Sequence, residues 1–185
     1  MTDQPTSERA LSAVELESLM QRYQQSDEEA AAALIHQLSP QVFRFFLAQV
    51  RDRSQAEDLL QDFWLRIHHA RRTYRAGEPV LPWIYAVARR VQIDAYRRRS
   101  RISKHELQSE QLPERPVAVP DGKTSRIADW LKQLPPAQQE AVLLLKVSGL
   151  SLEEAARAMG TSVGAVKQKA HRAYKTLRQL FGAES

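Results

Sequence analysis

The sequence of 185 residues contains no cysteine. The chain therefore has no disulfide, thiol nucleophile or zinc ribbon of its own, and it cannot sense redox state through a thiol. It has only six glycines, which is few for a β-rich fold of this size. No apolar run approaches the roughly 18 residues that a membrane span needs, and the first residues lack the basic and apolar segments of a secretory signal. These absences favour a soluble, cytoplasmic protein.

Residues with high helix propensity are common, and apolar residues recur every three or four positions along most of the chain. This spacing predicts helices over residues 12–24, 27–38, 40–50, 54–67 and 82–99. Pro40 is expected to start or kink the third of these, and Ser54 with Glu57 forms a predicted capping box for the fourth. The glycine and proline within residues 71–81 predict a loop there. The sequence shows no alternation typical of strands.

A proline-rich stretch divides the chain. Residues 105–124 contain three prolines and no long apolar pattern, so we predict a linker there. Beyond it, we expect one helix over residues 127–134 and another that starts at Pro135-Pro136 and runs to Val147. The predicted fold class is all-α, with two small helical domains joined by a flexible linker. The predicted divisions are a disordered N-terminus at 1–11, a first domain at 12–104, the linker at 105–124 and a second domain at 125–185.

Residues 151–175 have the proportions of a helix-turn-helix. Ser151 and Glu154 form a capping box for a short first helix, and Gly160 suits a turn that needs a left-handed backbone. Small and apolar residues are expected to face inward: Ala155, Ala156, Met159, Val166 and Ala170. The second helix has an outward face that fits a DNA major groove. Residues expected on or beside that face are Ser162, Gly164, Ala165, Lys167, Gln168, Lys169, His171 and Arg172. The simpler alternative is a helical hairpin with a cationic surface.

The net charge of +5 is unevenly distributed along the chain. Residues 64–104 carry 11 basic and 2 acidic side chains, and residues 162–185 carry 5 basic and 1 acidic. Residues 1–35 carry 2 basic and 7 acidic side chains. One basic run is as typical of a solvated surface as of a binding site. Two basic blocks in two different modules favour a polyanionic partner.

The sequence gives little support for an enzyme. His68 and His69 are adjacent, so they cannot share a helical face as metal ligands. There is also no glycine-rich phosphate loop. We therefore expect no catalytic residue, no metal, no cofactor and no small-molecule substrate.

Three segments together resemble a known family. Residues 56–67, AEDLLQDFWLRI, and residues 81–101, LPWIYAVARRVQIDAYRRRSR, follow the family order of an acidic Leu-x-Gln-acid-x-Phe helix, a loop, and then Pro-Trp, Ala-Arg, Asp and Arg-rich positions. Residues 134–144, LPPAQQEAVLL, lead into the helix-turn-helix. The chain resembles bacterial sigma factors of the extracytoplasmic-function (ECF) type, in the sigma-70 family. The resemblance covers about residues 30–104 and 125–181.

The resemblance implies a subunit that binds core RNA polymerase and directs initiation at promoter DNA. It places Asp58, Gln61 and Asp62 on the helix that binds core polymerase, although the two aspartates equally suit the polar face of an amphipathic helix. It assigns residues 71–99 to the −10 promoter element and the helix-turn-helix to the −35 element. Residues expected to contact −10 DNA are Arg71, Arg72, Tyr74, Arg75, Arg89, Arg90, Arg97 and Arg98. An anti-sigma factor, often membrane-bound in this family, is a further implied partner.

Three residues of this region have a structural interpretation beside the functional one. Tyr74 suits either stacking on a flipped base or packing of its loop. Trp83 is expected to anchor the start of its helix in the core. Asp94, among many arginines, is expected to form an ion pair.

Two positions depart from the family pattern. Arg90 stands where the family often has Asn, and Lys169 stands where it often has Arg, so we expect phosphate contacts rather than a defined base preference. The competing hypothesis is a helix-turn-helix transcriptional regulator, in which residues 1–104 form a sensor or dimerisation domain. The aromatic and arginine-rich block at 64–104 favours the sigma factor, because a simple sensor domain does not need it.

Overall fold

The computed structural model describes residues 11–50, 52–106, 131 and 133–183. This part of the chain is helical and contains no strand, which confirms the all-α prediction. Its elements are α1 (Ala13–Gln24), α2 (Glu28–Val50), α3 (Arg53–Ala70), η1 (Arg71–Thr73), α4 (Val80–Glu106), α6 (Pro136–Val142), η2 (Leu143–Val147), α7 (Leu152–Met159) and α8 (Val163–Ala183). Most of the predicted N-terminal segment, linker and 127–134 helix lies outside the described residues. No helix of the described part is long and apolar enough to cross a membrane.

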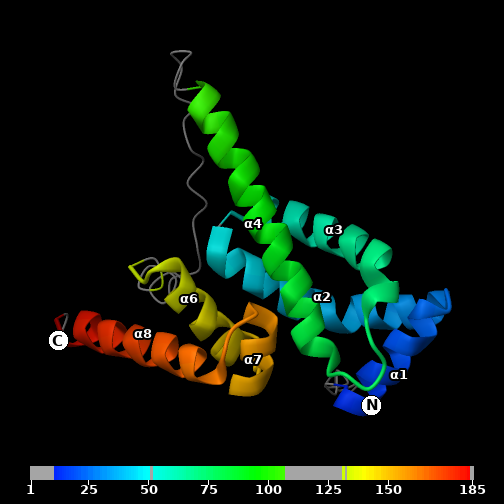
Figure 1. Ribbon diagram of the computed structural model, residues 1–185. Coiled ribbons are helices and arrows are strands. Elements are labelled where there is room, and N and C mark those ends of the chain that lie inside the picture. Colours follow the sequence, from blue (N-terminus) through cyan, green and yellow to red (C-terminus); the bar gives the residue numbers. More distant parts are fainter. Residues whose placement is uncertain (1–10, 51, 107–130, 132, 184–185) are drawn as a thin grey trace, which may run out of the picture.

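Helices α1 to α4 pack together as a first helical unit (Figure 1). Its centre is aromatic, with Phe45 and Phe46 on α2, Phe63 on α3 and Tyr85 on α4 all fully buried. Neighbouring rings in this group are tilted or edge-on, and their centroids lie between 5.3 and 6.1 Å apart. Burial of each ring contributes about 2 kcal/mol to stability. Packing of these rings fixes the positions of α3 and α4, whose outer faces carry the exposed polar residues.

Pro40 does not divide the second predicted helix from the third, because α2 continues through it. A proline inside a helix costs about 3 kcal/mol through its missing N–H and its ring clash. The buried residues Leu34, Leu38, Val42 and Phe45 follow one stripe across Pro40 in unbroken helical phase. Burial of this stripe outweighs the cost of the proline. A new helix start at Pro40 was therefore wrong, while the alternative, a kink at Pro40, stays a prediction.

The predicted capping box at Ser54 was also wrong. Helix α3 begins at Arg53, and Asp52 is its N-cap, with the carboxylate accepting a hydrogen bond from the Gln55 N–H at 2.9 Å. Glu57 pairs with Arg53, one turn earlier, at 2.9 Å. Asp and Ser are about equally good N-caps, so the local sequence offers two starts and the structure uses the earlier one.

The second helical unit is the predicted helix-turn-helix with α6 and η2 before it. Ser151 and Glu154 form both hydrogen bonds of the capping box at the start of α7. Gly160 ends α7 with φ 61° and ψ 43°, the left-handed conformation that glycine adopts without steric cost. The Ser162 hydroxyl accepts a hydrogen bond from the Ala165 N–H at 3.2 Å at the start of α8. The expected inward residues of both helices are buried.

The two helical units contact each other through α4. One side of α4 packs against α3 and the other against α7, while η2 packs against α2 (Figure 1). Tyr85 lies at this junction, beside Phe45 of α2 and Ser148 at the end of η2. Burial raises the pKa of the Tyr85 hydroxyl, and the neighbouring Ser148 hydroxyl partly offsets that rise. The described chain therefore has a closed arrangement, in which the helix-turn-helix unit covers part of α4.

Candidate nucleic-acid interface

Helix α4 carries six arginines between residues 89 and 101. It begins two residues before Pro82, which suits a first helical turn, and continues beyond the predicted end at residue 99. The exposed basic side chains along it are Arg90, Arg97, Arg98, Arg99 and Arg101. Tyr96 is also exposed, at 69% of its full surface. The outer half of α4 thus presents an exposed aromatic ring within an arginine-rich stretch.

The three arginines of the segment before α4 differ in their exposure to solvent. Arg72 and Arg75 are exposed. Arg71 is half-buried, its guanidinium lies 5.8 Å from the centre of the Tyr23 ring, and it donates a hydrogen bond to the His68 carbonyl oxygen. Arg71 therefore joins η1 to α1 and is less available to DNA than its two neighbours.

Tyr74 packs its loop, which is the second of its two predicted interpretations. The side chain is 4% exposed, and its ring lies edge-on to Trp83 with centroids 5.7 Å apart. The Tyr74 hydroxyl donates to the Glu78 carbonyl oxygen at 2.6 Å, and burial raises the hydroxyl pKa. Trp83 is half-buried near the start of α4, as expected of an anchor. Stacking of Tyr74 on a base would require this loop to move.

Ion pairs join α4 to α3 along their polar faces. Asp94 accepts from Arg66 at 2.6 Å, which confirms the structural role expected for Asp94. The hydrogen bond from Arg66 holds the pKa of the Asp94 carboxyl below its usual value. Arg98 pairs with Asp62 at 2.9 Å. Two of the residues predicted for different partners, polymerase and DNA, are thus bound to each other.

The other two residues predicted to bind polymerase are exposed to solvent on α3. Asp58 and Gln61 are exposed, and they stand opposite the buried stripe of Leu59, Phe63 and Ile67. The indole N–H of Trp64 donates to the Ser39 hydroxyl of α2 at 2.9 Å. The apolar face of α3 therefore packs into the core, with Trp64 at its edge.

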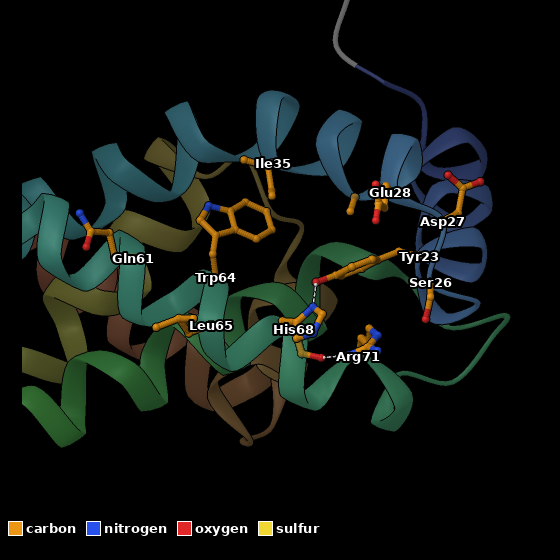
Figure 2. A pocket seen from close by; sticks show the side chains of 11 residues that line it. Tyr23, Ser26, Asp27, Glu28, Ile35, Gln61, Trp64, Leu65, His68 and Arg71 are labelled. Carbon is orange, nitrogen blue, oxygen red and sulfur yellow. Dashed lines mark hydrogen bonds between the residues drawn. The ribbon is translucent and has the colours of Figure 1, made fainter.

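An open groove of about 640 Å³ runs beside Gln61, between α3 and the ends of α1 and α2 (Figure 2). Ile35, Trp64 and Leu65 line its apolar end, and Ile35 and Leu65 are 43% and 61% exposed. At the other end, the Tyr23 hydroxyl and His68 Nδ1 are hydrogen-bonded at 3.0 Å. Sequence reasoning did not identify this groove, because Ile35 and Leu65 come from helices that are distant in the sequence.

Helix α8 presents the predicted −35 face to solvent. Gly164, Lys167, Gln168, His171 and Arg172 are exposed on it. Ala165 and Lys169 are half-buried. Ser162 is exposed and acts as the helix cap. The face keeps its expected composition, and Lys169 turns partly toward α6.

Glu140 on α6 lies at the contact between the two units. Its side chain is 12% exposed, and its Oε1 accepts a hydrogen bond from Nε of Arg89 at 2.5 Å. Burial raises the pKa of the Glu140 carboxyl, and the positive charges of Arg89 and Lys169 partly offset that rise. One carboxylate therefore faces a basic residue of α4 and a basic residue of α8. No sequence signal marks this pair, because Arg89 and Glu140 are 51 residues apart.

Metal chemistry has no candidate site in residues 11–50, 52–106, 131 and 133–183. No group of three or more histidines, aspartates or glutamates is placed there to hold an ion. The exposed polar residues of α4 and of the α8 face are mainly arginines, lysines and amides, which bind phosphate and base edges.

Two family models match the two helical units. Residues 34–102 match sigma-70 region 2, and residues 125–177 match sigma-70 region 4. The RNA polymerase sigma factor CarQ of Myxococcus xanthus is 33% identical over 166 residues, which cover 88% of this chain and 95% of CarQ. The ECF RNA polymerase sigma factor SigD of Mycobacterium tuberculosis is 32% identical, over 82% of this chain and 77% of SigD.

Solved structures share the fold. CnrH, in complex with the cytosolic domain of CnrY, aligns with a TM-score of 0.74 at 21% identity, over 92% of this chain and 99% of that one. The sigma factor RpoE, in complex with the anti-sigma factor NepR from Bartonella quintana, aligns with a TM-score of 0.70 at 22% identity, over 83% and 98%.

These matches decide between the two hypotheses for the first unit. A sensor or dimerisation domain is set aside, because most of the first unit matches sigma-70 region 2. The arginine-rich α4 and the helix-turn-helix follow each other in the order of regions 2 and 4. The chain belongs to the ECF group of the sigma-70 family of RNA polymerase sigma factors.

Proposed function

We propose that this ECF sigma factor directs core RNA polymerase to promoters by binding polymerase through α3 and DNA through two separate basic surfaces. The observation that carries the proposal is that exposed basic residues project from two different helical units, on α4 and on α8. Surfaces on two units are able to engage two promoter elements at once, which a single helix-turn-helix cannot do.

The first DNA surface consists of α4 and the segment before it, and we assign it to the −10 element. The exposed residues Arg72, Arg75, Arg90 and Arg97 supply charge for the phosphate backbone. Promoter opening exposes unpaired bases, and an exposed aromatic ring among arginines is a suitable stacking platform. Tyr96 has that position, so we assign the stacking role to Tyr96 rather than to the buried Tyr74.

The second DNA surface is the exposed face of α8, and we assign it to the −35 element. Lys167, Gln168, His171 and Arg172 lie on that face, where they reach base edges or phosphates in a major groove. Gly164 and Ala165, near the start of α8, allow close approach to the DNA backbone. Lys and Arg on this face are better suited to phosphate than to a defined base.

The surface for core polymerase is formed by Asp58 and Gln61 of α3, and we extend it to the adjoining groove. Gln61 lines the groove, so the polar and the apolar parts are continuous. Exposed Leu65 and Ile35 would then be buried by the polymerase, while the aspartate meets its basic residues. Asp62 joins this surface once it is released from Arg98.

Three further aspects follow from family membership. We propose that the protein acts in the cytoplasm, where polymerase and promoters are found, and that it performs no chemical step itself. We also propose that an anti-sigma factor holds it inactive. The relatives CnrH and RpoE, which share its fold, were solved in complex with CnrY and with the anti-sigma factor NepR.

In vitro transcription tests the whole proposal. Purified protein added to core polymerase should give discrete transcripts from genomic templates, and it should co-purify with the core. The double variant Lys167→Ala with Arg172→Ala should lose those transcripts but still bind core. The matched control is Lys146→Ala, which removes an exposed charge of the same unit away from α8. Absence of both transcripts and core binding in the unaltered protein would contradict the proposal.

A further inference from the structure

We propose that Glu140 holds the free protein in a closed, DNA-occluded state by occupying Arg89 in place of a DNA phosphate. The inference rests on the proposed function, since it takes α4 as a DNA surface. It concerns a contact within the chain, between the unit that would read the −10 element and the unit that would read the −35 element.

The geometry of the pair is that of a specific contact. Arg89 Nε and Glu140 Oε1 are 2.5 Å apart, and the carboxylate side chain is 12% exposed. A guanidinium binds a carboxylate and a phosphate through the same N–H groups, so a carboxylate in this position competes directly with DNA. Arg89 is half-buried, whereas its neighbour Arg90 is exposed. The closed arrangement thus partly withdraws one arginine of α4 from solvent.

Glu140 also faces the second DNA surface. The charge of Lys169 on α8 acts on the Glu140 carboxyl together with that of Arg89. The titratable groups that bear on Glu140 from the helices packed around it are therefore both basic. Glu140 thus offers its negative charge to Arg89, which is assigned to the −10 element, and to Lys169, which is assigned to the −35 element. A carboxylate in this position replaces a DNA phosphate as the partner of both residues.

The rest of the contact supports the same closed state. Tyr85 of α4 and Ser148 after η2 are buried where the units meet. At the edge of the contact, Arg157 of α7 lies 3.7 Å from Glu78 in the loop before α4, with both side chains more than half exposed. Such an exposed pair is weak, so the Arg89–Glu140 pair, in which both side chains are partly buried, is the stronger of these two polar contacts.

Fluorescence energy transfer within the full chain tests the closed state. The chain has no cysteine, so Ala76→Cys and Ala137→Cys, both at exposed positions in different units, provide the only two labelling sites. Glu140→Lys and Arg89→Glu, each placing like charges together, should lower the transfer efficiency. The double variant, which restores opposite charges in exchanged positions, should regain it. Single variants with the transfer of the parent, or a double variant as open as the singles, would overturn the proposal.

Binding to a mixed-sequence forked DNA then tests the occlusion. Glu140→Lys should bind this DNA about five- to tenfold more tightly than Glu153→Lys. Glu153 is an exposed acid of α7, so its variant has the same net charge and controls for that change. If Glu140→Lys opens the chain without this gain, Glu140 acts as a latch but α4 is not the DNA surface, and the assignment under the proposed function fails. If it binds more tightly without opening, the latch itself is refuted.

Discussion

Asp62 on α3 and Arg98 on α4 form an ion pair with 2.9 Å between Oδ2 and Nη2, so a residue assigned to polymerase binds a residue assigned to DNA. Both side chains are about half exposed, and a pair of this kind contributes about 0.5 kcal/mol to stability. The pair matters because it engages both side chains. While it persists, Asp62 is not available to polymerase and Arg98 is not available to DNA.

Substitution of Asp62 should therefore affect the two partners in opposite directions. Asp62→Asn is expected to weaken core binding, since one acid of the docking surface is lost, and to strengthen binding to single-stranded DNA two- to threefold as Arg98 is released, about 0.5 kcal/mol. Both affinities are measured by fluorescence anisotropy. Glu57→Gln, which breaks a pair within α3, is the matched control and should change neither affinity. Equal effects of both variants would argue against the assignment of Asp62.

The groove beside Gln61 gives a second prediction. Leu65→Asp places a charge where the polymerase is expected to bury an apolar side chain, so core affinity should fall about tenfold or more. Leu65 is 61% exposed, and the free energy of unfolding should change little. Val14→Asp, at an equally apolar residue of α1 that is 76% exposed, should leave core binding intact. A similar loss in both variants would mean that the effect is not specific to the groove.

Local sequence signals predicted the second unit better than the first. The capping box at Ser151, the turn at Gly160 and the cap at Ser162 each depend on residues within three or four positions, so the pattern determines them. The helix start at Pro40 and the cap at Ser54 were wrong, because burial of the α2 stripe and a competing cap at Asp52 decide those boundaries. Helix ends were thus predictable where a local cap decides them, and not where burial or a competing cap does.

The candidate site was predictable as a set of residues but not as a set of contacts. The basic residues of α4 and α8 were identified from charge and family pattern. Pairing of Arg98 with Asp62 and of Arg89 with Glu140 depends on how distant helices pack, and no spacing in the sequence encodes it. For the same reason, the loop position of Tyr74 left stacking and packing equally open until its burial against Trp83 was seen.

Gly160 and Gly164 should respond to alanine in opposite ways. Gly160 has φ 61°, where a Cβ strains the backbone although it would meet no neighbouring atom within 4 Å, so Gly160→Ala should cost about 1 kcal/mol of unfolding free energy. Gly164 is the second residue of α8, and Gly164→Ala should stabilise the chain by about 0.5 kcal/mol through helix propensity, less than in a helix interior. Urea unfolding of the full chain measures both. Destabilisation by Gly164→Ala would show that an added methyl group at this position clashes with a neighbour, although the structure places only Ser162 Oγ near it, at 4.0 Å.

Tyr96 should matter to single-stranded DNA more than Tyr74 does. Tyr96→Ala removes the exposed ring among the α4 arginines and should weaken binding to a single-stranded oligonucleotide by about 1–2 kcal/mol, with unchanged stability. Tyr74→Phe removes only a hydroxyl that is bonded to the Glu78 carbonyl, so it should lower stability and leave DNA affinity unaffected. Loss of DNA binding in Tyr74→Phe instead would return the stacking role to the loop.

The buried carboxyl of Glu140 predicts a pH dependence of stability. Burial raises the pKa of this carboxyl above the ordinary 4.5, and the charges of Arg89 and Lys169 offset only part of that rise. The folded chain therefore binds the Glu140 proton more tightly than the unfolded chain does. The stabilisation that this group contributes is complete below its unfolded pKa and is lost as the pH rises through the folded pKa. Glu140→Gln, which resembles the protonated form, should remove that part of the decline, which begins near the ordinary carboxyl pKa of 4.5 and extends to higher pH. Arg89→Gln should steepen the decline, because the charge that lowers the Glu140 pKa is gone. Parallel stability curves for all three proteins, measured by urea unfolding across this range, would show that Glu140 ionises freely and is not held between the two units.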